Sequence, residues 1–157
     1  MTDTALTHRY AGTPVQKTAL IAGIIFLVVG IAGFIPGLTH SAEHLHAAGA
    51  SSDAQLLGVF QVSVLHNIVH LAFGIAGLAF AARARASRLY LMIGGLVYLV
   101  VWVYGLIAVG NDQINIIPVN DADNWLHLVL AIAMVLLGIF VPYERRVPRN
   151  GSHAARA

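Results

Sequence analysis

Four long apolar runs dominate the chain, and its polar residues gather between them. The runs cover residues 18–38, 56–82, 89–110 and 125–141. A helix needs about 20 residues to cross the hydrocarbon core of a bilayer, and each run approaches or exceeds that length. None of the runs alternates polar and apolar residues as the strands of a membrane barrel do. The pattern predicts an all-α four-helix transmembrane bundle with helices at about 17–38, 55–82, 88–110 and 123–142.

Composition supports a lipid environment. The chain is 58% hydrophobic and 10% charged, whereas soluble domains contain about 25% charged residues. A soluble protein of this size has no means of hiding so much apolar surface, so the predicted partner of these helices is the lipid bilayer. Cysteine is absent, which excludes disulfides, thiolate metal sites, iron–sulfur clusters and haem attached through cysteine.

Charge is distributed unevenly along the chain. All nine Lys and Arg residues precede the first run, lie between the second and third runs, or follow the fourth. The loops at 39–55 and 111–123 lack Lys and Arg but carry acidic residues. By the positive-inside rule, both termini are predicted to be cytoplasmic in a multi-pass protein of the bacterial inner membrane. A net charge of +2 is too small to indicate nucleic-acid binding.

The ends of the chain differ from its apolar middle. We expect a flexible cytoplasmic N-terminus at 1–16, a transmembrane domain at 17–142 and a basic cytoplasmic tail at 143–157. The first run is longer than the 7–15 apolar residues of a signal peptide, and no clear cleavage site follows it. A retained first helix is therefore predicted.

The second and fourth runs resemble each other. Residues 66–80 align with residues 123–137, and both segments contain Asn-x-x-His-Leu. The first and third runs show a fainter similarity. Because the second and fourth helices run in the same direction, the bundle is predicted to contain two parallel two-helix repeats, related by an axis along the membrane normal.

The repeat places four candidate metal ligands at similar depths. Residues four apart share one helical face, so His66 with His70 and Asp123 with His127 form two such pairs. If these faces meet, three imidazoles and one carboxylate converge in the outer half of the bundle. Such a set suits a divalent ion such as zinc, copper or iron, with Asn67 and Asn124 as candidate second-shell partners that orient the imidazoles.

Three alternatives stay open for the same residues. The polar side chains are also explained as hydrogen-bonding partners between helices, and Asp123 as an acidic residue that begins the last helix. His70 and His127 are also spaced as axial ligands of a b-type haem, although haem leaves His66 and Asp123 without a task.

The first outer loop adds further candidate ligands at the mouth of the bundle. Glu43 with His44 and His46, and His40 just before them, form a polar cluster suited to recruiting a cation. A solvated loop is the commoner explanation of such a segment.

The sequence resembles a family of small bacterial four-helix membrane proteins that is known only as a domain of unknown function. The likeness covers about residues 17–141, and its most specific parts are Val64-Leu65-His66-Asn67 with His70-Leu71, and Asn124 with Leu126-His127-Leu128. The resemblance implies a stand-alone bacterial membrane protein, and it implies no activity.

We therefore expect a metal-binding membrane protein. The rival class is a structural or accessory subunit of a homo-oligomer or larger membrane complex, held by faces of small and aromatic residues, and a b-type cytochrome is the third reading. No nucleophile with its base is evident, so we infer no particular reaction from the sequence. An open coordination position on a bound metal would permit redox or hydrolytic chemistry.

Overall fold

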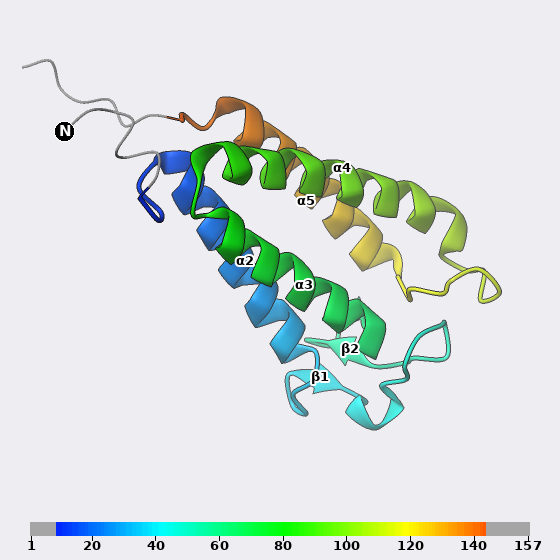
Figure 1. The fold of residues 1–157 in the computed structure, drawn as a ribbon. Helices are drawn as coiled ribbons and strands as arrows, with labels where there is room; N and C mark the ends of the chain where they lie inside the picture. The colour runs from blue at the N-terminus through cyan, green and yellow to red at the C-terminus, as the bar shows by residue number, and fades with distance from the viewer. Residues whose placement is uncertain (1–8, 144–157) are drawn as a thin grey trace, which may run out of the picture.

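The protein folds into a bundle of four antiparallel helices arranged as two pairs (Figure 1). The computed structural model describes residues 9–143. Helices α2 (Pro14–Ala32) and α3 (Val64–Phe80) form the first pair, and α4 (Ala84–Ala108) and α5 (Asp121–Phe140) form the second. The four-helix bundle predicted from the apolar runs is confirmed.

Each pair is built on contacts that only glycine permits. A Cβ atom on Gly77 of α3 would lie 2.6 Å from the Cα of Gly23 in α2. In the second pair, a Cβ on Gly95 of α4 would lie 2.9 Å from the carbonyl oxygen of Ala131 in α5. The helix backbones therefore approach each other closely, as small residues allow in membrane bundles.

The two pairs meet at one end of the bundle, which we call the basic end because Arg83, Arg85 and Arg88 lie there. The N–H of Val15 in α2 donates to the carbonyl of Pro142, after α5, at 3.3 Å and so joins the two pairs. Hydrogen bonds within each pair also lie at this end. Gln16 is fully buried, and its side-chain nitrogen donates to the carbonyls of Arg9 and Ala81, both at 2.9 Å. Arg88 donates to the carbonyl of Val141 at 3.2 Å. From this end the pairs diverge toward the opposite end, the loop end (Figure 1).

Helix starts follow local capping signals. Thr13 forms a capping box with Gln16 at the start of α2, where Pro14 occupies the first turn. Ser63 accepts a hydrogen bond from the backbone N–H of His66 and so begins α3. Asn120 forms a second capping box with Asp123 at the start of α5.

The loop end differs from the sequence expectation for the second helix. Helix α3 begins at Val64 and not at residue 55, because the preceding residues form a small antiparallel sheet with strands β1 (Thr39–His40), β2 (Gln55–Leu56) and β3 (Phe60–Gln61). Leu57 and Gly58 connect β2 to β3 with φ angles of 55° and 70°. This left-handed turn is incompatible with a continuous helix, so the predicted helix start at 55 is wrong.

The first helix is also shorter than expected. It ends at Ala32 and not near residue 38, and Gly37 adopts a φ angle of 94° in the turn that leads to β1. A short 3₁₀ helix (Ala42–His44) follows β1. The expected flexible N-terminus and basic tail fall mostly at 1–8 and 144–157, outside the described residues.

The outer surface of the bundle is apolar. Three helices, α2, α4 and α5, are long and apolar enough to cross a membrane, and α3 is an apolar helix of 17 residues. Large aliphatic side chains such as Val28 on α2 and Val100 on α4 are 59% and 68% exposed. Surface of this kind requires lipid around it, and the chain is a membrane protein.

Replacing Gly77 with leucine should separate α2 from α3. The new side chain would overlap the α2 backbone at Gly23, so we expect the free energy of unfolding to fall by about 1–3 kcal/mol. Denaturant unfolding in detergent, followed by circular dichroism, measures the loss. Ala79→Leu, at an exposed position of the same helix, is the matched control, and equal stability of the two variants would contradict this packing.

Candidate functional site

Three of the four predicted ligands come together between the helix pairs. His66 and His70 of α3 stack with ring centroids 4.7 Å apart, and His127 of α5 lies 6.1 Å from His66. All three side chains are at most 8% exposed. Helices from different pairs therefore contribute to one buried histidine cluster, which we define as His66, His70 and His127.

Aromatic side chains surround the histidine cluster. Phe26 of α2 lies 5.8 Å from His70, and Tyr98 of α4 lies 5.5 Å from His127, measured between ring centroids. Phe26 and Tyr98 stack at 5.5 Å with an interplanar angle of 6°. All four helices thus contribute a ring at the level of the histidine cluster.

A cavity of about 410 Å³ lies beside the three imidazoles. Its walls come mainly from α3 and α4, and Ile116 and Ile117 from the loop before α5 contribute at the loop end. Tyr104 holds this loop in place, because its hydroxyl donates to the carbonyl of Ile114 at 2.8 Å and accepts from the N–H of Ile117 at 3.3 Å. We call this space the histidine cavity.

The imidazole nitrogens differ in their partners. Nδ1 of His70 is 3.0 Å from the carbonyl oxygen of His66. As the donor in that hydrogen bond, Nδ1 carries the proton, which leaves the lone pair of Nε2 available. Nδ1 of His66 and Nδ1 of His127 are buried and have no hydrogen-bond partner within residues 9–143. Buried polar atoms normally have partners, so such exceptions need an explanation.

Asp123, the fourth predicted ligand, is engaged elsewhere. It is 2% exposed, and its Oδ2 accepts hydrogen bonds from the backbone N–H groups of Asn120 at 3.0 Å and Gln61 at 2.9 Å. The first bond caps α5, and the second ties α5 to β3 of the other pair. Across the described part of the chain, no three His, Asp or Glu side chains are arranged to hold a metal ion.

The two asparagines of the Asn-x-x-His-Leu motifs lie in matching places. Asn67 packs against Gly33 after α2, and Asn124 packs against Gly105 of α4, where a Cβ atom would overlap the amide in both cases. Nδ2 of Asn67 and Oδ1 of Asn124 are buried without a partner among residues 9–143. The matching contacts are those that an internal repeat would give, and the repeat itself stays a prediction.

The four candidate residues at the mouth of the bundle lie on the surface of the loop end. The exposed side chains are His40 in β1, Glu43 and His44 in the 3₁₀ helix, and His46 after it. A role in recruiting a cation stays a prediction for them.

Two contributors to the site were missed at the sequence level. Phe26 contacts His70 from the middle of α2, where residues 19–32 include no polar side chain that would draw attention to this part of the helix. Gln61 contacts Asp123 through its backbone N–H, which any residue at that position would supply.

Comparison with known proteins agrees with this architecture. The family described as Domain of unknown function (DUF4383) matches residues 16–140. The chain belongs to this family. The match confirms the family resemblance, and it includes the histidine cluster, Asp123 and both asparagines of this DUF4383 protein. No curated protein and no solved structure matches the chain.

Replacing Asp123 with alanine should destabilise the DUF4383 fold without removing an imidazole. The partly buried backbone N–H groups of Asn120 and Gln61 would lose their acceptor, so the free energy of unfolding should fall by about 1–3 kcal/mol. Denaturant unfolding tests this, with Asp121→Ala as the control, since Asp121 is an exposed acidic residue in the same helical turn. If Asp123→Ala is as stable as Asp121→Ala, the anchoring role is wrong.

Proposed function

We propose that this membrane protein binds a divalent metal ion through His66, His70 and His127. Asp123, which the sequence groups with them, serves the site as the anchor that fixes the start of α5. The observation that carries the proposal is the burial of three imidazoles in one place, two of them with an Nδ1 atom that lacks a partner among the described residues.

A metal ion accounts for this arrangement in physical terms. A buried polar atom without a partner costs about 1–3 kcal/mol, and a metal ion uses imidazole lone pairs that the apolar surroundings leave free. Imidazole nitrogens bind zinc at about 2.0–2.1 Å, so the three rings have to turn toward one centre. The histidine cavity of about 410 Å³ provides the space for that turn.

The ligand set limits the chemistry of the ion. Neutral imidazoles suit zinc, copper, iron or nickel, whereas magnesium and calcium prefer oxygen ligands. With three protein ligands, a coordination position is left for a water molecule or a second ligand. We assign no reaction to this position.

The orientation of the bundle sets the side from which an ion arrives. We propose that the protein lies in the bacterial inner membrane with its basic end and both termini in the cytoplasm. His66 is in the first turn of α3 and His127 in the second turn of α5, so the histidine cluster lies toward the outer surface. Assembly into a homo-oligomer or larger complex stays a prediction.

Metal content of the purified protein tests the proposed function. After purification with a tag that contains no histidine and incubation with zinc, we expect one equivalent of bound metal by elemental analysis. His66→Ala, His70→Ala and His127→Ala should each weaken binding by more than about 100-fold, since removing a ligand costs at least as much as removing its orienting partner.

Gln113→Ala is the control, because Gln113 is exposed in the loop before α5 and does not line the histidine cavity; it should keep one equivalent. A wild-type protein that binds no zinc, copper or iron, or three histidine variants that all bind normally, would overturn the proposal. A Soret band in the visible spectrum of the purified protein would show that the chain binds haem, and the metal-ion assignment would then be wrong.

Cysteine labelling tests the orientation, because the natural chain contains no cysteine. Ser51→Cys, at the loop end, should react with a membrane-impermeant maleimide in intact cells. Ala82→Cys, at the basic end, should react only after the cells are permeabilised. Both positions are exposed, so accessibility on the protein is matched, and the reverse labelling pattern would show the opposite orientation.

A further inference from the structure

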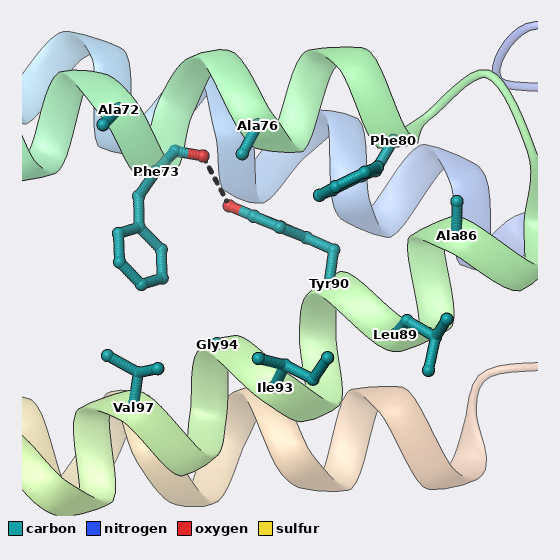
Figure 2. A pocket seen from close by; sticks show the side chains of 10 residues that line it. All are labelled: Ala72, Phe73, Ala76, Phe80, Ala86, Leu89, Tyr90, Ile93, Gly94 and Val97. Carbon is teal, nitrogen blue, oxygen red and sulfur yellow. Dashed lines mark hydrogen bonds between the residues drawn. The ribbon is translucent and has the colours of Figure 1, made fainter.

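An open apolar groove of about 520 Å³ runs between α3 and α4 in the half of the bundle nearer the basic end, from Ala72 and Val97 to Phe80 and Ala86 (Figure 2). Small residues on both helices create the space, with Ala72 and Ala76 on α3 facing Gly94 on α4. Both the volume and the apolar lining are typical of a site for a small molecule, since such sites measure about 300–1,000 Å³.

The groove offers an occupant no free polar side chain. Tyr90 carries the one side-chain polar atom among its ten lining residues, and the Tyr90 hydroxyl donates to the carbonyl oxygen of Phe73 at 3.1 Å (Figure 2). Ile93 and Leu89 on its rim are 56% and 50% exposed, so in a membrane the groove opens sideways to lipid. An apolar chain is therefore the fitting occupant of this part.

The groove adjoins the histidine cavity. Phe73 and Val97 line both spaces, so a molecule that enters from the bilayer meets the apolar groove first and the imidazoles beyond Phe73. The apolar lining of the groove offers no ligand for a metal ion, so metal binding alone does not explain the groove. A second copy of the chain does not fit either, because a helix about 10–12 Å across would place only about one turn in this volume.

The polar end of this path selects a neutral, flat head group. The histidine cavity is lined by no Lys or Arg residue, and burying an anionic head without a counter-charge is costly. His66 and His127 line the cavity, and a neutral imidazole that binds a metal ion through one ring nitrogen keeps an N–H on the other, which donates to a carbonyl oxygen. Phe73, Tyr98 and Tyr104 add aromatic faces on which a ring can stack.

We propose that the protein binds a membrane quinone, with its isoprenoid tail in the groove between α3 and α4 and its carbonyl-bearing ring in the histidine cavity. The inference goes beyond the metal site and rests on the groove, which the metal proposal does not use. It concerns binding, and no electron transfer is included in it.

Titration with decylubiquinone tests this inference. The purified full chain in detergent should bind the quinone saturably, with quenching of the fluorescence of Trp102 and Trp125 as the readout. Ala72→Phe should weaken binding about tenfold or more, because the larger side chain fills the groove at its junction with the cavity. The control is Ala79→Phe. Ala72 and Ala79 are both exposed on α3, but Ala79 does not line the groove, so this variant should keep the wild-type affinity for decylubiquinone.

The outcomes separate this inference from the proposed function. Unsaturable quenching, equal affinity of the Ala72→Phe and Ala79→Phe variants, or saturable binding of palmitate in place of the quinone would each overturn it. Ala72→Phe should keep its bound metal, which also shows that the variant folds. If the wild-type chain binds no metal but binds decylubiquinone saturably, the metal proposal falls and the quinone proposal stands.

Discussion

Close approach of helix backbones inside each pair is the constraint on which the rest of the structure depends. Gly77 lets α2 and α3 touch, and Gly95 does the same for α4 and α5. In lipid, where apolar surface gains little from leaving its surroundings, such close packing is a main source of helix association. Because each pair is stabilised internally, the two pairs need not pack closely along their whole length. Hydrogen bonds join them at the basic end, from Val15 to Pro142, and at the loop end, from Gln61 to Asp123, and the groove between α3 and α4 stays open.

The polar groups of the bundle divide into two kinds. At the ends, Gln16, Tyr104 and Asp123 use their side chains to satisfy backbone groups that the helices leave unpaired, as a membrane protein requires. Just inside the loop end, in the first two turns of α3 and α5, imidazole and amide atoms of His66, His127, Asn67 and Asn124 lack partners among residues 9–143. The polar groups that have partners are therefore given a structural role, and those without partners are given a binding role in the two proposals.

The sequence was sufficient for the number and class of the helices, because apolar runs of membrane length have few alternatives. It also pointed to the residues of the histidine cluster, since i and i+4 spacing on α3 and a matching motif on α5 fix which faces are polar. It failed at the start of α3, where Leu57 adopts a left-handed conformation that its residue type does not favour. It assigned Asp123 to a metal because spacing alone does not reveal the backbone N–H of Gln61, which the fold brings to it.

The unequal lengths of α3 and α4 have a consequence for the surrounding bilayer. At 1.5 Å per residue, the 17 residues of α3 extend about 25 Å, whereas the 25 residues of α4 extend about 37 Å. Hydrocarbon cores average about 30 Å, and membranes thin locally beside a short helix or let a long one tilt. The first turns of α4 carry Arg85 and Arg88, so its apolar part, residues 89–108, extends about 30 Å and matches the hydrocarbon core, whereas the shorter α3 favours local thinning of the bilayer beside it. The change in hydrophobic thickness between α3 and α4 therefore falls at the opening of the groove, where acyl chains contact both helices.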